Sequence, residues 1–222
     1  MRQIVVAVDG PAGAGKSTAS RGLATHLGYA YVDTGAMYRA VGVLACEGGV
    51  ALDDDAALAR LVAGLRFELR DGGAGLAVDG RDVSLAIRRP DAGELASRVS
   101  TRPVVRERLV ALQRRLGASG GVVMEGRDIG TVVFPDAPVK FFLTAAPTER
   151  ARRRAAELRA RGDAVDEETL AAELAARDRR DSARAESPLR PAGDARVLDT
   201  TEIPLDEVVA RMEAAVRAYL AR

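Results

Sequence analysis

Short apolar runs along the chain alternate with longer stretches in which apolar residues recur at helical spacing. Strands are predicted over five of these runs, at residues 4–8, 29–32, 122–124, 139–143 and 196–198. Most of the runs are almost continuously apolar, which is typical of parallel strands covered on both faces. Helices are predicted between them, for example over residues 17–27 and from Pro103 to Gly117. The alternation predicts an α/β fold that binds ligands at the carboxyl ends of its strands.

Two regions interrupt this alternation. Residues 65–83 hold two short alternating segments separated and followed by glycine-containing turns, a pattern that predicts a small antiparallel insert. Residues 148–166 form an arginine-rich helical segment that runs into Gly162, and we expect it to act as a movable flap. Since no repeat or low-complexity linker separates these regions, residues 1–222 are interpreted as one domain with two insertions.

Composition and charge narrow the possible functions. The 222 residues are 47% hydrophobic and 29% charged, as a packed soluble core requires. A net charge of +1 gives no basic field for nucleic acid or membrane, and neither is expected as a partner. One cysteine and one histidine make a disulfide or a metal cage of these residues improbable. Without an apolar leader or membrane span, a cytoplasmic protein is expected, and we take it as a monomer.

A glycine-rich segment follows the first predicted strand. It reads Gly10-Pro11-Ala12-Gly13-Ala14-Gly15-Lys16-Ser17, with Thr18 beside it, and it matches the phosphate-loop pattern G-x-x-x-x-G-K-[ST]. Its glycines let backbone N–H groups approach a phosphate, and the helix that follows adds a positive dipole end. Lys16 is expected to bridge the β- and γ-phosphates, and Ser17 to bind Mg²⁺. The motif predicts a nucleoside triphosphate site and leaves the acceptor open.

Other segments separate the classes of phosphate-loop protein. A switch GTPase reads guanine with an Asn-Lys-x-Asp segment, and this chain contains no asparagine. No Leu-Ser-Gly-Gly segment indicates a transporter ATPase. A small-molecule kinase and an ATP-driven motor or binding module remain. The strand at 122–124 runs into Glu125-Gly126-Arg127-Asp128, and an arginine beside an aspartate suits an anionic acceptor better than water activation, which favours a kinase.

Four segments, spread over nearly the whole chain, resemble those of the bacterial cytidylate kinases. They are DGPAGAGKS at residues 9–17, DTGAMYR at 33–39, GRDIGTVVFPDA at 126–137 and RDRRDSAR at 177–184. Glu125 and Thr34 depart from the residues that are common in that family, but each keeps the functional group. The resemblance implies transfer of the γ-phosphoryl group of ATP, bound with Mg²⁺, to CMP or dCMP. It also implies a five-stranded parallel sheet, a monophosphate-binding insert at about 35–105 and a mobile helical lid at about 148–166.

The resemblance also assigns a set of acceptor residues: Thr34, Arg39, Ser97, Arg106, Arg127, Asp128, Arg177, Asp181 and Arg184. A phosphate requires cationic donors and a hydroxyl, which the threonine and Arg39, Arg127 and Arg184 would supply. A carboxylate can accept from the N4 amine of cytosine and not from uracil, so Asp128 is expected to read the base.

Ser97 and Arg106 are expected to donate to the acceptor edge of the same base. Arg177, Asp181 and Arg184 recur at i, i+4 and i+7, which predicts one helical face, and the first two are assigned to the ribose hydroxyls.

Charge neutralisation during transfer is expected from Lys16, Arg127 and two arginines of the lid. The lid segment carries six arginines, and by position Arg153 and Arg154 are those expected over the ATP phosphates. Two alternatives stay open. A kinase for UMP or AMP would share the loop but lack the long 126–137 match, and a non-catalytic ATP-binding module would leave the acceptor residues without a role.

Overall fold

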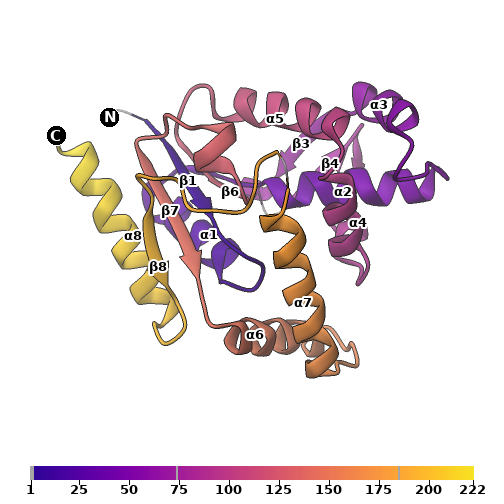
Figure 1. Cartoon of the computed structure of the whole chain (residues 1–222). Helices are drawn as coiled ribbons and strands as arrows, with labels where there is room; N and C mark the ends of the chain where they lie inside the picture. The colour runs from indigo at the N-terminus through magenta and orange to yellow at the C-terminus, as the bar shows by residue number, and fades with distance from the viewer. Residues whose placement is uncertain (1–2, 74, 185) are drawn as a thin grey trace.

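Five parallel strands form the central sheet of the computed structural model, which describes residues 3–73, 75–184 and 186–222 (Figure 1). The strands are β1 (Val5–Asp9), β2 (Ala30–Asp33), β6 (Val122–Glu125), β7 (Val139–Thr144) and β8 (Arg196–Asp199). They lie in the order β2-β6-β1-β7-β8, and every neighbouring pair is parallel. The predicted α/β fold with five parallel strands is therefore confirmed. The observed strand ends lie within one residue of the predicted ones.

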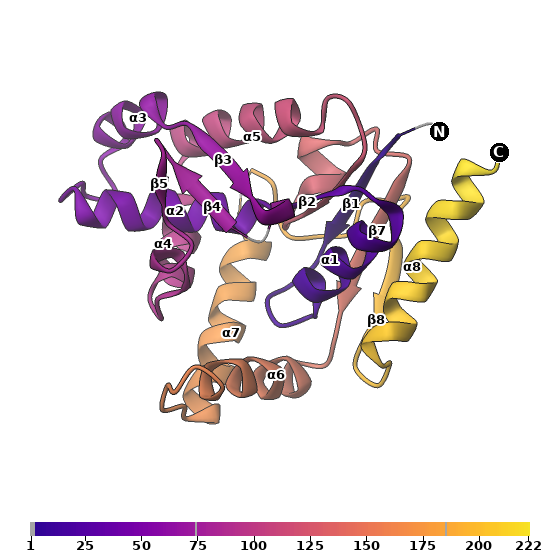
Figure 2. The same ribbon diagram turned by 180° about the vertical axis from the view of Figure 1, so that it is seen from behind.

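Helices cover both faces of this sheet, which explains why the strands are so continuously apolar. Helices α1 (Lys16–Leu27) and α8 (Leu205–Leu220) pack together on one face, against Val6 and Val8 of β1. The other face of β1, with Val5 and Ala7, packs against the helical turn Ile129–Val133. Helix α5 (Pro103–Gly117) begins at the predicted proline and lies on this second side (Figures 1 and 2).

A second unit projects from one end of the main sheet. It consists of helices α2 (Thr34–Glu47), α3 (Asp55–Gly64) and α4 (Ala92–Val99) and an antiparallel sheet. The three strands are β3 (Phe67–Arg70), β4 (Gly75–Val78) and β5 (Arg81–Asp82), in the order β3-β4-β5. The antiparallel insert predicted at residues 65–83 is confirmed. A separate core that includes Met37, Leu58 and Leu109 joins the insert to the helices around it.

The remaining pair of helices lies beyond the carboxyl ends of β7 and β8, at the bottom of Figures 1 and 2. Helix α6 (Pro147–Arg159) contains most of the predicted arginine-rich segment, and α7 (Glu167–Ser182) packs against it through a small cluster of Ala151, Ala155, Leu170 and Leu174. The prediction that Arg184 shares a helical face with Arg177 is wrong in part, because α7 ends two residues before Arg184.

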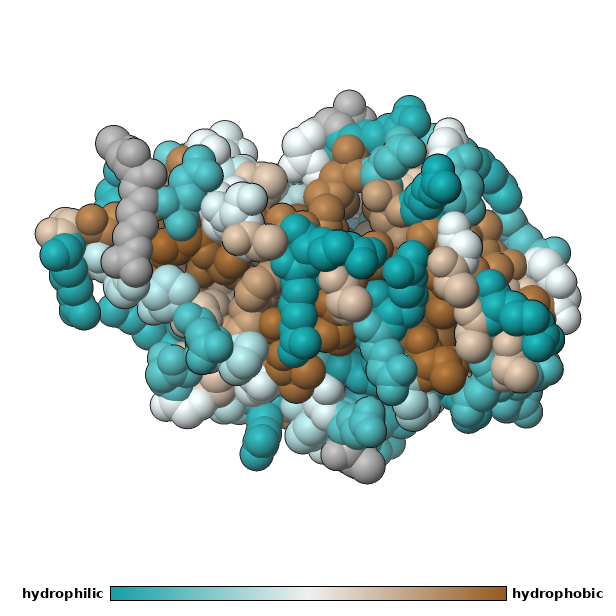
Figure 3. All heavy atoms as spheres, turned by 90° about the horizontal axis from the view of Figure 1, so that it is seen from above, coloured by the Kyte–Doolittle hydropathy of each residue, from teal (hydrophilic) through white to brown (hydrophobic). Residues whose placement is uncertain are grey.

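In the part of the chain that the structure describes, no helix has the length and apolar character that a membrane crossing requires. The surface seen from above carries hydrophilic side chains interspersed with apolar ones (Figure 3). Because all five strands run in the same direction, the segments that follow them converge at one edge of the sheet. The fold therefore brings the phosphate loop, residues 126–128 and the start of α2 to a common position.

Candidate active site

A cavity of about 760 Å³ opens at the carboxyl edge of the sheet, between the phosphate loop, α2, α4, α6 and α7. Most of the residues predicted for the site line it: Ala12, Gly13, Gly15, Lys16, Ser17, Thr18, Thr34, Arg39, Ser97, Arg106, Arg127, Asp128, Arg153, Arg154, Arg177, Asp181 and Arg184. Gly10, Pro11 and Ala14 belong to the loop but do not line the cavity. The structure thus places the predicted donor and acceptor residues around one space.

The phosphate loop has the backbone geometry that its glycines predict. Gly10 has φ +144°, and a Cβ there would lie 1.9 Å from the carbonyl oxygen of Leu143, so only glycine fits. Gly15, at φ +79°, begins α1 in the left-handed region. Lys16 is 6% exposed and folds back over the loop, where its Nζ donates to the Pro11 carbonyl at 2.7 Å. The loop is therefore preformed, with its ammonium group held inside the curve.

Positive charge accumulates where this loop faces the acceptor residues. Burial lowers the pKa of Lys16 to about 7, and the guanidinium group of Arg127 acts in the same direction. Burial also lowers the pKa of Arg177 to about 10, with further repulsion from Arg127. Such depressed pKa values mean that burial and repulsion from Arg127 outweigh the attraction of the nearby carboxylates, Glu125 and Asp9 for Lys16 and Asp181 for Arg177. A bound anion would relieve this repulsion, so the arrangement favours phosphate groups.

The start of α2 presents a hydroxyl and an arginine to the cavity. Thr34 Oγ1 donates to the carbonyl oxygen of Glu125 at 2.7 Å, which ties α2 to the end of β6. One carboxylate oxygen of Asp33 accepts from the Ala36 N–H at 2.9 Å and so caps the helix. The other oxygen accepts from Arg39 Nη2 at 2.7 Å. Asp33, which sequence analysis did not include in the site, thus holds Arg39 beside the threonine.

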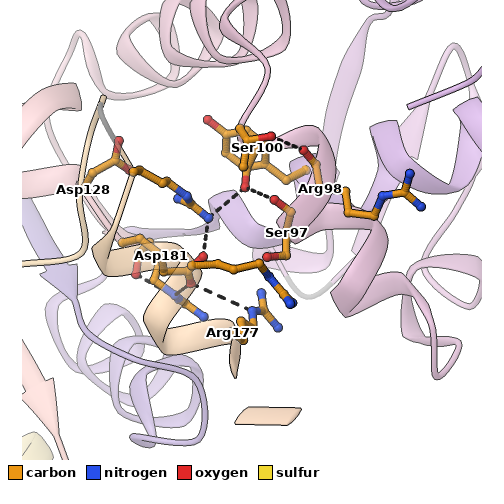
Figure 4. A network of polar contacts seen from close by, with 12 residues as sticks. Ser97, Arg98, Ser100, Asp128, Arg177 and Asp181 are labelled. Carbon is orange, nitrogen blue, oxygen red and sulfur yellow. Dashed lines mark hydrogen bonds and ion pairs between the residues drawn. The ribbon is translucent and has the colours of Figure 1, made fainter. Parts of the chain in front are cut away.

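Asp181 is the centre of a second group of charges. The carboxylate is 2% exposed and forms ion pairs with Arg127 at 3.3 Å and Arg177 at 3.9 Å. It also pairs closely with Arg184, although that residue lies beyond the helix. Figure 4 shows Asp181 and Arg177 facing Ser97, from the neighbouring helix α4. One carboxylate therefore orients three arginines: Arg127 and Arg177 contact its Oδ2, and Arg184 contacts its Oδ1.

Two serines connect α4 to these arginines. Ser97 is 2% exposed, and its Oγ has no hydrogen-bond partner among the described residues although it lines the cavity. Ser100 donates to the Ser97 carbonyl at 2.8 Å and accepts from Arg184 Nη2 at 2.8 Å. A buried hydroxyl without a partner at a cavity wall is available to form a hydrogen bond with a ligand. Sequence analysis missed Ser100, because no spacing distinguishes it from an ordinary helix-terminal serine.

A buried polar network forms the far end of the cavity. Arg106 Nη2 donates to Asp128 Oδ2 at 2.5 Å and to Ser187 Oγ at 2.7 Å, and Nη1 donates to the Tyr38 hydroxyl at 3.4 Å. The Arg106 and Asp128 side chains are 7% and 8% exposed. Ser187 lies 59 residues from Asp128 in the sequence, and no sequence motif marks it. The network fixes the carboxylate at the cavity wall.

Asp9, at the end of β1, fixes the segment that carries Arg127 and Asp128. Its two carboxylate oxygens accept from the backbone N–H groups of Ile129 and Gly130, each at 2.8 Å. Burial raises the pKa of Asp9 from 3.8 to about 6, and these two hydrogen bonds oppose the rise. Asp9 therefore holds the backbone after β6 in place. Its position directly before the phosphate loop in the sequence did not predict this role.

The two predicted lid arginines have different surroundings. Arg153 donates from Nη1 to Thr200 Oγ1 at 2.9 Å and from Nη2 to the Thr200 carbonyl at 2.6 Å, and it lies close to Gly15. Arg154 pairs with Glu157 at 2.7 Å on the surface of α6. Both line the cavity and both pair with a carboxylate of α6, Arg153 with Glu149 at 2.7 Å, but only Arg153 also contacts Thr200 and lies against the loop.

Oxygen ligands for a divalent cation gather beside Ser17. Glu125 is 3% exposed and accepts a hydrogen bond from Tyr31. Burial raises the pKa of Glu125, the carboxylate of Asp33 raises it further, and a hydrogen bond from Ser17 opposes the rise. This hydroxyl and two carboxylates are hard ligands that suit Mg²⁺. Among the described residues, no group of three or more histidine, cysteine or carboxylate side chains is placed to hold a metal ion.

Comparisons with known proteins show a resemblance in sequence over most of the chain. The family model described as cytidylate kinase matches residues 6–218. The cytidylate kinase of Syntrophotalea carbinolica is 52% identical over 213 residues, which cover 95% of this chain and 91% of that protein. The cytidylate kinase of Pelotomaculum thermopropionicum is 51% identical over 216 residues, which cover 96% of each.

Solved structures resemble this chain at the level of the fold. A gluconokinase from Sinorhizobium meliloti aligns with a TM-score of 0.52 and 16% identity, and the match covers 98% of this chain and 94% of that one. A shikimate kinase from Bacteroides thetaiotaomicron aligns with a TM-score of 0.50 and 12% identity, covering 97% and 99%. At such low identity these likenesses establish the phosphate-loop kinase fold alone.

The raised pKa of Asp9 predicts a pH dependence of stability. The folded chain keeps the Asp9 proton up to a pH of about 6, whereas the unfolded chain loses it near 3.8. Relative to Asp9→Asn, the wild-type free energy of unfolding should therefore be highest below pH 4 and fall as the pH rises to 6. Each pH unit in this interval costs at most about 1.4 kcal/mol.

Urea denaturation of both proteins from pH 4 to pH 7 measures this difference. Asp53→Asn, at an exposed aspartate, serves as the control variant. A wild-type minus Asp9→Asn difference that does not change with pH would contradict the assignment of the raised pKa to Asp9.

Proposed function

This chain belongs to the cytidylate kinase family, and we propose that it transfers the γ-phosphoryl group of ATP to CMP or dCMP, giving ADP and the nucleoside diphosphate. The observation that carries this proposal is the positive charge between the phosphate loop and the acceptor residues. The pKa values of Lys16 and Arg177 are lowered by burial and by their cationic neighbour Arg127, so two phosphate groups brought together here would each be stabilised.

The donor end is the phosphate loop. Backbone N–H groups of residues 12–15 and the N-terminus of α1 surround the β- and γ-phosphates of ATP, and Lys16 supplies a point charge between them. Ser17, together with the nearby carboxylates of Asp33 and Glu125, would hold Mg²⁺. When bound, the ion neutralises phosphate charge and orients the transferred group. Arg153 and Arg154 complete the donor side from α6.

The acceptor end uses the residues that α2, α4 and α7 present. The phosphate of CMP is bound by Thr34, Arg39 and Arg127, with Arg184 beside them. Asp181 and Arg177 bind the ribose hydroxyls. Because Asp181 already orients its neighbouring arginines, the site needs little rearrangement to receive a sugar and a phosphate.

The base occupies the buried end of the cavity. Asp128 accepts from the N4 amine of cytosine, and Arg106 and the unpartnered Ser97 hydroxyl donate to the acceptor edge of the ring. Uracil presents a carbonyl oxygen where cytosine presents the amine. It would leave Asp128 facing another acceptor, and the resulting desolvated mismatch disfavours UMP.

Transfer in this arrangement depends on alignment and charge neutralisation. The two phosphates lie in line, and Lys16, Arg127 and the lid arginines surround the moving group, so no side chain acts as an essential strong base. Closure of the lid at about residues 148–166 over the cavity excludes water and limits hydrolysis of ATP. All of these residues come from one chain, so we propose an active monomer, working in the cytoplasm where ATP is available.

A coupled assay of ADP formation with CMP, dCMP, UMP and AMP tests the proposed function. We expect turnover with the two cytidine nucleotides, and Lys16→Met should lower kcat at least about 100-fold because the transition-state charge loses its closest cation. The control Arg211→Met, at an exposed arginine on α8, should keep normal activity. Preference for UMP or AMP would replace the proposal with another kinase, and nucleotide binding without turnover would favour a binding module.

Base recognition predicts a change of selectivity in Asp128→Asn. The amide can donate to the O4 carbonyl of uracil and no longer offers a carboxylate to the cytosine amine. The ratio of kcat/KM for CMP to that for UMP should therefore fall about tenfold or more. Asp136→Asn, at an exposed aspartate eight residues along the chain, is the matched control. If the ratio is the same in Asp128→Asn as in the wild type, another residue reads the base.

A further inference from the structure

A buried arginine that does not line the cavity joins the phosphate loop to the helix that carries the ribose residues. Arg150 lies in the first turns of α6, and its side chain is 8% exposed. Its Nε donates to the Ala145 carbonyl at 3.2 Å, and its Nη1 donates to the Ala12 carbonyl, in the phosphate loop, at 3.1 Å. The same Nη1 forms an ion pair with Asp178 Oδ2, on α7, at 2.6 Å.

The loop packs directly on this part of α6. A Cβ on Gly13 would lie 2.9 Å from the Arg150 carbonyl oxygen and 3.0 Å from the Arg150 Cβ, so the two backbones touch. Ala12 also packs against the apolar cluster between α6 and α7. The position of the loop on this side therefore depends on where Arg150 is held.

The other end of the ion pair lies on the acceptor side. Asp178 is next to Arg177 and three residues before Asp181 in α7, and both of these neighbours line the cavity. The second carboxylate oxygen of Asp178 is buried and has no hydrogen-bond partner among the described residues. A buried carboxylate that loses its ion-pair partner is strongly destabilised, so the pair fixes α7 relative to Arg150.

We propose that Arg150 and Asp178 are positioning residues that set the distance between the two nucleotide sites. Because one guanidinium group holds both the preformed donor loop and the acceptor helix, ATP that fixes the loop against α6 also fixes α7, and CMP binds more tightly to the fixed helix. This coupling rests on the proposed function, since it requires that both nucleotides bind. Linkage makes it reciprocal, so CMP also tightens the binding of ATP.

A second ion pair between the same helices provides a matched control. Arg159 on α6 pairs with Glu167 on α7 at 2.6 Å, but both side chains are about half exposed, and neither lines the cavity. Solvent screens such a pair, so its removal should have little effect. The two pairs differ in burial and in the contact with the Ala12 carbonyl, which are the features that the proposal uses.

Calorimetry of CMP binding tests the coupling in the wild type and in the variants Asp178→Asn and Glu167→Gln. Each protein is titrated with CMP alone and again in the presence of the non-hydrolysable analogue β,γ-methylene ATP with Mg²⁺. In wild type and in Glu167→Gln, the analogue should tighten CMP binding about fivefold or more. In Asp178→Asn this factor should fall close to one, although each nucleotide alone binds within about threefold of its wild-type affinity. The kcat of Asp178→Asn should also be lower than that of the wild type, because the two nucleotide sites are no longer held at a fixed distance.

A melting temperature measured for each variant separates positioning from simple stabilisation. If Asp178→Asn melts earlier but keeps the wild-type coupling factor, the pair is only structural and the proposal is wrong. An absence of coupling in the wild type would also overturn it, whereas a wild type that binds no CMP would first overturn the proposed function. Should Asp178→Asn fail to fold, Arg150→Lys is used instead. Lysine is one bond shorter and lacks the Nε that donates to the Ala145 carbonyl, so its ammonium group is not held where Nη1 contacts both Ala12 and Asp178, and the variant should also lose the coupling.

Discussion

The structure depends on the concentration of buried positive charge at one edge of the sheet. Burial lowers the pKa values of Lys16 and Arg177, and the positive charge of Arg127 lowers both further. Such an arrangement is unfavourable in the free protein, and it becomes favourable when phosphate groups occupy the cavity. The buried positive charge therefore explains why the cavity suits two phosphate groups, as a kinase of this family needs.

Carboxylates at the ends of strands and helices make this arrangement possible. Asp9 anchors the segment that follows β6, Asp33 caps α2 and holds Arg39, and Asp181 orients three arginines. Each of them acts through a cation or a backbone segment beside it. Together they hold in place cations that repulsion would otherwise drive apart. The cavity therefore keeps the shape that its ligands require.

Features carried by contiguous residues could be predicted from the sequence, and features created by packing could not. The apolar runs predicted the five parallel strands, and the glycines of the phosphate loop predicted its position between β1 and α1. Ser187 reaches Arg106 only because the segment after α7 passes beside α5, and Arg150 is one of six similar arginines until the structure buries it. Arg184 keeps its contact with Asp181 although the helix that predicted the contact ends earlier.

The central claim is that one cavity holds the two nucleotides with their phosphates end to end. Titration with a single molecule in which adenosine and cytidine are joined through five phosphates tests this claim by calorimetry. One molecule should bind per chain, and the saturated protein should bind neither ATP nor CMP. If the saturated protein still binds either nucleotide at full stoichiometry, the donor and acceptor sites are not adjacent and the account is wrong.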